Sequence, residues 1–330
     1  VGAGEASFGT IVPPIIDSIS PKDRKSTYLS IYFLAIPLGY ALGFLFGGLI
    51  EQFINWHFSF MIESILMLIL SFILLGFRTY LFKIERTEAL LKEDYGTLEE
   101  PKHKILNMNF KEKIKTLFKN KIFIFSVLAY SFYTYVIGSF SYWGPVYLIE
   151  QFDMKKSLTN YIFGGITVGT GIIGSFLGGF ILDKFRNKYN MKTKYSNIKI
   201  ANRICFISIL FALFLCLITF SFNNLYFFII GFIFIELGLF IITGPINSMI
   251  LWSLEDKEKY TINLNDELKT FGCSLSILSI HLLGDIPSPI ITGAIQDLSK
   301  NWNITMLSLS SVLVLGSVFF VINEIIVKKY

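Results

Sequence analysis

Apolar runs alternate with charged stretches along the whole chain. Nine of these runs are long enough, or nearly so, to cross a hydrocarbon core of about 30 Å, which takes roughly 20 helical residues. They cover residues 1–17, 28–52, 58–82, 121–149, 158–183, 202–221, 225–253, 268–296 and 303–327. A bilayer satisfies no free backbone groups, and the runs lack the two-residue alternation of barrel strands. We therefore predict nine transmembrane helices.

Positive charges gather in every second connection between the runs. The basic connections are residues 20–27, 78–121, 184–203 and 255–269 with the C-terminal tail, and they hold 26 of the 29 Lys and Arg residues. Because cytoplasmic loops carry the excess of Lys and Arg, this set is predicted to lie in the cytoplasm. The C-terminus is then cytoplasmic, and Val1 lies on the opposite side of the membrane.

The order of the runs predicts two halves. The chain starts inside an apolar run, so we expect further helices before Val1, and three of them would bring the total to twelve. Residues 1–82 then form the last three helices of an N-terminal half, 83–120 a cytoplasmic linker, and 121–330 a six-helix C-terminal half. This layout resembles the all-α fold of major facilitator transporters, with about nine of twelve transmembrane helices present and a site between the halves.

The composition is typical of a membrane protein and gives no sign of a nucleic-acid, metal or cofactor partner. Hydrophobic residues make up 53% of the chain and charged residues 16%, against about a quarter charged in soluble domains. The cytoplasmic connections account for the net charge of +5, so no nucleic-acid partner is expected. Cys205, Cys216 and Cys273 lie in apolar runs without paired spacing. We interpret them as packing residues and expect neither a metal nor a cofactor.

We single out five ionisable side chains within the predicted helices: Glu5, Glu63, Glu236, His281 and Asp285. Each costs roughly 2.5–3.5 kcal/mol at a bilayer centre, so each needs a partner or a function. His281 and Asp285 are four residues apart, and a Gly and a Pro beside them break the helix. They share one helix face, and we interpret them as a functional pair in the substrate cavity. Glu63 and Glu236 fit either a role in transport or a structural contact with Arg or hydroxyl groups.

Glycine and proline mark the second run as special. Pro37 and Gly39 open a series of glycines at four-residue spacing along one helix face. Such a face lets another backbone approach closely. The pattern fits either plain tight packing or a hinge that helps to seal a transport pathway.

A charged motif closes the fifth run at its predicted cytoplasmic end. Asp183 and Arg186 lie in the string Gly178–Lys188, which resembles the cytoplasmic loop motif of major facilitators. The acidic residue would pair with a basic residue or cap a neighbouring helix, and so hold one conformation shut. An ordinary charged helix end is the alternative. We assign Asp17 and Arg24, which flank the first cytoplasmic turn, to the same gate.

Several short stretches carry a more specific resemblance. They are Gly2–Ser7 (GAGEAS), the turn Pro21–Arg24, Gly138-Ser139, Trp143–Pro145 and 281–289 (HLLGDIPSP). They resemble parts of the fourth, seventh and eleventh helices of the Spinster family of major facilitators. The likeness spans nearly the whole chain and places its start in the fourth helix. It implies a transporter of lysophospholipids or sphingoid phosphates, commonly proton-coupled, in an endolysosomal, vacuolar-type or plasma membrane.

The resemblance also implies roles for single residues. In that family a fourth-helix glutamate, matched here by Glu5, is implicated in proton coupling with an acidic residue and an arginine that would both precede Val1. The aromatic seventh helix, with Tyr135 and Trp143, suits a cavity for an amphiphile. The expected partners are therefore a lipid or other small-molecule substrate, protons and membrane lipids, and a monomer is expected.

Three other functions have to be weighed against this one. The nearest is a major facilitator for another solute, such as an organic anion or a drug-like cation. A membrane enzyme using His281 and Asp285 would need a nucleophile or metal ligands, and no such motif is present, so we expect no enzyme. A receptor without transport would not need two equivalent halves. No nucleotide-binding glycine loop is present, so coupling to ATP is not expected.

Overall fold

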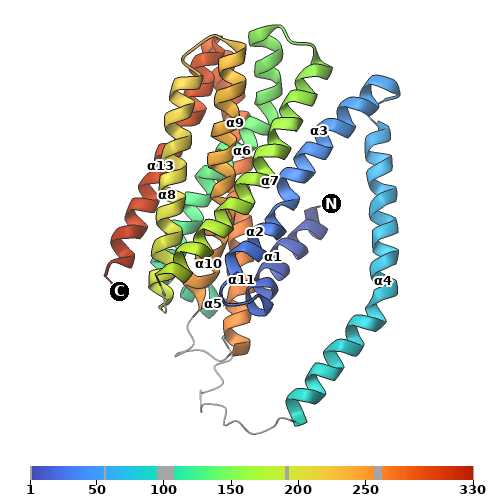
Figure 1. Ribbon diagram of the computed structural model, residues 1–330, viewed down its shortest axis with the longest axis vertical. Coiled ribbons are helices and arrows are strands. Elements are labelled where there is room, and N and C mark those ends of the chain that lie inside the picture. The colour runs from blue at the N-terminus through green and yellow to red at the C-terminus, as the bar shows by residue number, and fades with distance from the viewer. Residues whose placement is uncertain (1, 56, 95–107, 190–192, 256–261, 330) are drawn as a thin grey trace.

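The structure is a computed structural model. It describes residues 2–55, 57–94, 108–189, 193–255 and 262–329, with side chains there except in 2–7, 51–52, 78–94 and 262–266. Every regular element in these ranges is helical (Figure 1). The helices are α1 (Gly2–Ile19), α2 (Lys25–Phe33), α3 (Ala35–Phe53), α4 (His57–Asp94), α5 (Phe110–Lys119), α6 (Lys121–Phe152), α7 (Lys156–Lys188), α8 (Lys194–Thr219), α9 (Leu225–Ile241), α10 (Thr243–Leu254), α11 (Ile262–Ile280), the π-helix η1 (His281–Asp285), α12 (Pro287–Ser299) and α13 (Trp302–Val327).

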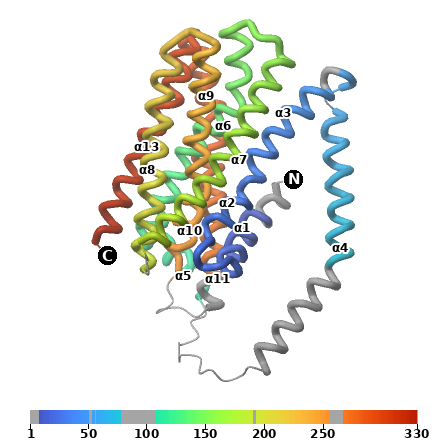
Figure 2. Tube along the Cα trace, viewed as in Figure 1, coloured from blue at the N-terminus to red at the C-terminus, as the bar shows by residue number. Residues whose placement is uncertain are grey.

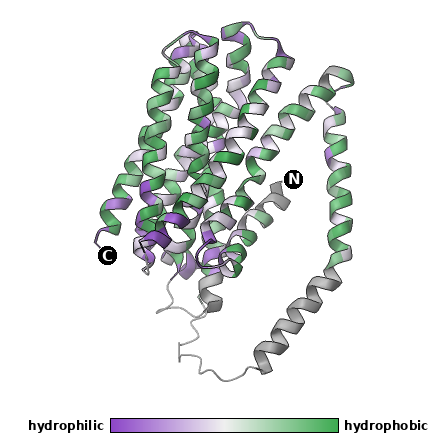
Figure 3. Cartoon of the chain, viewed as in Figure 1, coloured by the Kyte–Doolittle hydropathy of each residue, from purple (hydrophilic) through white to green (hydrophobic). Residues whose placement is uncertain are grey.

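Eight helical stretches within the described ranges are long and apolar enough to cross a membrane. They correspond to the last eight predicted spans, while the apolar part of α1 that carries described side chains, Phe8–Ile19, is shorter. Figure 3 shows apolar residues along the middle of the bundle and hydrophilic residues gathered towards its ends. The predicted all-α, multi-pass membrane fold is thus confirmed.

Three of the eight spans are interrupted, and proline gives the reason. A proline ring clashes with the carbonyl four residues earlier and lacks an N–H to bond it. α2 ends at Phe33, four residues before Pro37, and α9 ends at Ile241, four residues before Pro245. Before Pro287 the chain widens into η1, since a π-helix shifts the hydrogen-bond pattern by one residue.

The main hydrophobic core lies among α6, α7, α8, α9, α10 and α13. Phenylalanine and tyrosine rings fill its end near the α8–α9 turn: Phe228 lies 5.1 Å from Tyr147 and 5.2 Å from Phe232 between ring centroids. The buried members of this core begin at Leu117, so the six later spans supply nearly all of it.

The earlier helices pack against one side of this core. α1 lies beside α11 and α2, α2 packs on α7 and α10, and α3 runs along α7. α4 stands at the edge of the molecule in Figures 1 and 2, and no side chain in its apolar stretch is buried. α4 packs mainly beside α3, so its apolar side chains are exposed in the structure.

The expected linker, 83–120, includes regular structure. α4 continues into it as far as Asp94, and α5 occupies its end. Asn109 and Glu112 form a capping box at the start of α5, which satisfies backbone groups at that helix end. Leu117 is fully buried in the main core, and the Phe110 ring meets Phe271 of α11 at 5.4 Å. α5 is therefore anchored to the C-terminal bundle.

Candidate functional site

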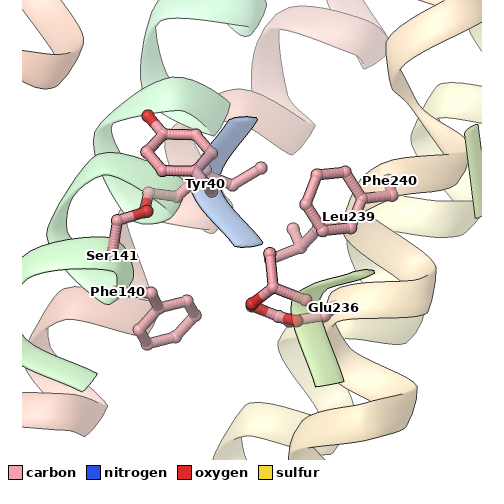
Figure 4. A pocket seen from close by; sticks show the side chains of 8 residues that line it. Tyr40, Phe140, Ser141, Glu236, Leu239 and Phe240 are labelled. Carbon is pink, nitrogen blue, oxygen red and sulfur yellow. The ribbon is translucent and has the colours of Figure 1, made fainter. Parts of the chain in front are cut away.

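A small cavity lies between α3 and the helices α6, α7 and α9 (Figure 4). Its volume of about 10 Å³ leaves room for about one water molecule. Its lining residues are Tyr40, Ile137, Phe140, Ser141, Thr167, Glu236, Leu239 and Phe240. Tyr40 comes from the predicted N-terminal half and the other seven from the C-terminal half, so the cavity lies between the two.

Glu236 supplies the carboxylate of this cavity. Its side chain is buried on α9 and accepts hydrogen bonds from Thr167 Oγ1 at 3.2 Å and Thr170 Oγ1 at 3.0 Å. The two threonines are three residues apart and so share one face of α7. In the described part of the chain, Glu236 has these two hydroxyl partners and no basic one.

The His281–Asp285 pair lies on η1. His281 Nδ1 is 2.9 Å from Asp285 Oδ2, which confirms the predicted contact. Both side chains are partly exposed, at 44% and 33%. The π-helix lies close to α6, because a Cβ added to Gly284 would come within 2.7 Å of the Ser131 carbonyl oxygen. A larger residue there would push η1 away from α6.

Tyr135 and Trp143 lie on α6 but outside the small cavity. The Trp143 indole N–H donates to the Pro289 carbonyl at 2.9 Å, and its ring meets Trp302 at 5.9 Å. Trp143 therefore joins α6 to α12 and α13. Tyr135 is buried beside Gly284. Of the residues assigned to the cavity from the sequence, Glu236 lines it and these two aromatic residues do not.

A buried ionic cluster joins α1 to α2 and α11. Asp17 Oδ2 accepts a hydrogen bond from Lys269 Nζ at 2.7 Å, and Asp17 Oδ1 accepts one from Lys25 Nζ at 3.3 Å. Asp17 and Lys269 are 3% and 5% exposed. Arg24, assigned to the same gate from the sequence, lies apart and pairs at 3.6 Å with exposed Asp23. The basic partners are therefore Lys25 and Lys269.

Asp183 forms a second polar cluster at the same end. Its carboxylate accepts hydrogen bonds from the backbone N–H groups of Ser26 at 3.2 Å and Thr27 at 2.7 Å, and from Thr27 Oγ1 at 2.8 Å. It thus caps the start of α2, where the free N–H groups of a helix favour a negative charge. Arg186 pairs with Asp183 at 3.0 Å, and its guanidinium lies 4.5 Å from the Trp252 ring centroid.

The proline of the second run meets a glycine of the neighbouring helix. A Cβ added to Gly171 of α7 would lie 2.1 Å from the Pro37 Cβ, so glycine allows α3 and α7 to touch. At Gly39, by contrast, an added Cβ meets nothing within 4 Å in the structure. The close approach expected along the glycine face of α3 stays a prediction at Gly39, and the glycine that contacts Pro37 belongs to α7.

The last two predicted residues, Glu5 and Glu63, lie on α1 and α4. Glu5 belongs to α1, but its side chain lies outside the described residues. Glu63 is exposed on α4.

A sequence model of the Major Facilitator Superfamily matches residues 1–261. The chain belongs to this superfamily. Among its relatives is an Arabidopsis thaliana protein named probable sphingolipid transporter spinster homolog 2, 33% identical over 323 residues, which cover 95% of this chain and 60% of the relative. Homolog 3 from the same organism is 31% identical over 349 residues, covering all of this chain and 64% of the relative. These relatives confirm the resemblance to the Spinster branch of major facilitators.

The chain spans about three fifths of the length of these curated relatives. A solved structure of a bacterial homologue of the human lysosomal transporter Spinster, in an inward-facing and unoccupied conformation, has the same fold. It superposes with a TM-score of 0.60 at 14% identity and covers 96% of this chain and 74% of the other.

Sequence reasoning missed four residues that contact Asp17 or Glu236. Lys25, Lys269, Thr167 and Thr170 each contact an acidic residue that the sequence did single out. The three-residue spacing of the threonines on an apolar helix was a usable signal, since it places two hydroxyls on one face. The sequence does not show which helix these threonines face, because Thr170 and its partner Glu236 are 66 residues apart.

Proposed function

We propose that the whole protein is a secondary transporter that moves amphiphilic lipids of the lysophospholipid or sphingolipid class by alternating access, coupled to protons. The observation that carries this proposal is the pair of buried polar clusters around Asp17 and Asp183. Both clusters join helices of the predicted N-terminal half to helices of the C-terminal half, at the end predicted to be cytoplasmic. In this proposal the clusters hold that end closed, and they separate when it opens.

The energy of these contacts supports a two-state gate. Removing one partner from a buried ion pair costs about 3–5 kcal/mol, because the other charge is left buried without compensation. The Asp17–Lys269 pair is buried on both sides, so opening needs new partners for both groups. A substrate or proton can supply that free energy only by binding the open and closed states with different affinity.

Proton coupling draws on Glu236 as well as on Glu5. A buried carboxylate without a cation is costly, whereas a protonated carboxyl is neutral and can still share hydrogen bonds with hydroxyl groups. Glu236 has two threonine hydroxyls and no basic partner among the described residues, so it is suited to hold a proton in this conformation. Glu5 is assigned the same task through the family resemblance.

The substrate class rests on the named relatives, which are called probable sphingolipid transporters. A cavity of about 10 Å³ cannot hold a lipid, so the lipid pathway belongs to an open conformation. His281 and Asp285 are partly exposed on a broken helix and offer polar groups for a headgroup.

The second candidate function is that of a major facilitator for another solute, with the same gate. We place the protein, as a monomer, in an endolysosomal, vacuolar-type or plasma membrane.

Uptake by the whole protein in proteoliposomes tests this proposal. Labelled lysophosphatidylcholine and a sphingoid phosphate are offered with and without an inward proton gradient to wild type, Glu5→Gln and Glu236→Gln. We expect gradient-driven lipid uptake that both substitutions abolish. Glu267→Gln is the matched control, because it changes a glutamate near the start of α11 whose side chain is 56% exposed, and it should leave uptake unchanged.

The outcomes separate the parts of the proposal. Lipid uptake that ignores the gradient in all variants would remove proton coupling and keep the lipid substrate. No uptake of either lipid would refute the substrate class and favour another solute.

A further inference from the structure

A second, much larger cavity opens at the end of the bundle that carries the two polar clusters. It has a volume of about 980 Å³ and is bounded by α5 and by ends of α6, α8, α10, α11 and α13. This volume is at the upper end of the range for small-molecule sites. The transport proposal makes no use of it, and it lies apart from the cavity of Glu236.

Five lysines line this cavity, from α5 and from the helix ends around it. They are Lys115, Lys119, Lys121, Lys194 and Lys329. Glu112 is the one acidic residue of the lining, and its carboxylate already accepts the Asn109 backbone N–H at 3.0 Å in the capping box. The walls therefore carry a strong positive excess, which attracts an anion.

Four of the lysines are available to a ligand. Lys194 donates to the backbone carbonyls of Ser253 and Glu255 and so caps the end of α10. The other four are exposed, and within the described ranges none of them forms an ion pair. A lysine at the surface costs little to leave unpaired, but four around one hollow repel one another until an anion binds.

The position of α5 fits a ligand at the membrane surface. This helix carries lysines beside two exposed aromatic residues, Phe110 and Phe118, which are 65% and 62% exposed. Basic and aromatic residues on a short helix are typical of the interface between lipid headgroups and water. The floor of the cavity is apolar, with Leu117, Leu254 and Ile326 among its lining.

We propose that this cavity is a binding site for a polyphosphorylated headgroup, such as that of a phosphoinositide or the corresponding free inositol phosphate. Basic pockets between transmembrane helices on the cytoplasmic side suit such headgroups. The volume is too large for a single inorganic phosphate and accommodates several phosphate groups on a ring. Lys115, Lys119, Lys121 and Lys329 bind the phosphates. Two of them, Lys115 and Lys119, lie on α5, which Leu117 anchors to the C-terminal bundle.

The test compares two double variants of the whole protein that remove the same charge. Lys119→Gln with Lys121→Gln changes the cavity, and Lys111→Gln with Lys328→Gln changes two exposed lysines outside it. In one arm, fluorescently labelled inositol trisphosphate is titrated into protein in neutral-lipid nanodiscs and followed by polarisation. In the other arm, native mass spectrometry counts bound dioctanoyl phosphatidylinositol bisphosphate.

We expect the cavity variant to bind about tenfold more weakly than wild type, and the control variant to stay within about twofold. Binding in both arms identifies the phosphate groups alone as the ligand, and binding only in the lipid arm identifies a bilayer lipid. Equal binding by the two variants, or no binding by wild type in either arm, would overturn the proposal.

Discussion

In the proposed gate, replacing Lys269 with Met should open the end of the bundle that carries the Asp17 and Asp183 clusters. Lys269 Nζ lies 2.7 Å from Asp17 Oδ2, and both side chains are buried. Loss of one partner of a buried pair costs about 3–5 kcal/mol. Asp17 keeps its contact with Lys25 at 3.3 Å, so we expect a smaller loss. We take the substitution to destabilise the closed state by about 2 kcal/mol relative to the open state. That shifts the equilibrium about 30-fold towards the open state.

Cys273 provides a native probe of this change. It is 7% exposed and packs with Leu29 and Leu251, between α2, α10 and α11. Labelling by a water-soluble maleimide, in protein whose other cysteines are replaced, therefore reports opening of this end. We expect Lys269→Met to label about 30-fold faster than wild type.

Two controls separate the gate from local effects. Lys113→Met breaks a pair with Glu267, whose side chain is 56% exposed, and surface pairs contribute about 0–1 kcal/mol. It should change labelling by less than about fivefold. Asp17→Asn with Lys269→Met removes both the acid and its main partner and should restore slow labelling. The argument would be refuted if Cys273 in Lys269→Met were labelled at the wild-type rate, or if the double variant were labelled as fast as Lys269→Met.

Three further predictions follow from single contacts. Gly171→Ala places a Cβ 2.1 Å from that of Pro37 and should destabilise the protein by about 1–3 kcal/mol in thermal unfolding; Gly169→Ala meets nothing within 4 Å and should unfold like wild type, and equal losses would show that the α3–α7 contact is not tight. Asp183→Asn weakens the cap on α2 and the pair with Arg186, so Cys273 labelling should rise about tenfold; unchanged labelling would exclude Asp183 from the gate. Trp143→Phe removes the hydrogen bond to Pro289 and should cost about 1 kcal/mol of stability without changing which lipid is preferred in competition uptake; an altered preference would return Trp143 to the substrate cavity.

The sequence predicted the spans well because their signal is local. A run of about 20 apolar residues needs no partner to be recognised, and eight such runs are helices of the expected extent. The His281–Asp285 contact was predictable for the same reason, since four residues along a helix bring two side chains together. The break before Pro37 follows the carbonyl clash of proline, a local rule as well.

The sites were less predictable because their contacts join distant parts of the chain. Asp17 and Lys269 are 252 residues apart, and nothing local shows that Lys269 rather than Arg24 faces the acid. The contact at Pro37 is a second example. It uses Gly171 of α7, and the glycine spacing within α3 gives no sign of that partner. Which face of a helix meets a neighbour depends on the whole bundle.

A reversible lock across the closed end tests alternating access most directly. Ser30 of α2 and Gly244 of α10 face each other, with 3.1 Å between the Ser30 Cβ and a Cβ added to Gly244. That is a few tenths of an ångström below the usual spacing of about 3.5–4.5 Å in a disulfide, so a small shift lets two cysteines bond. Lipid uptake is measured for Ser30→Cys with Gly244→Cys under oxidising and reducing conditions, beside each single variant. The account predicts that oxidation stops uptake by the double variant alone and that reduction restores it. Equal uptake by the oxidised and reduced double variant, with the disulfide verified, would contradict it.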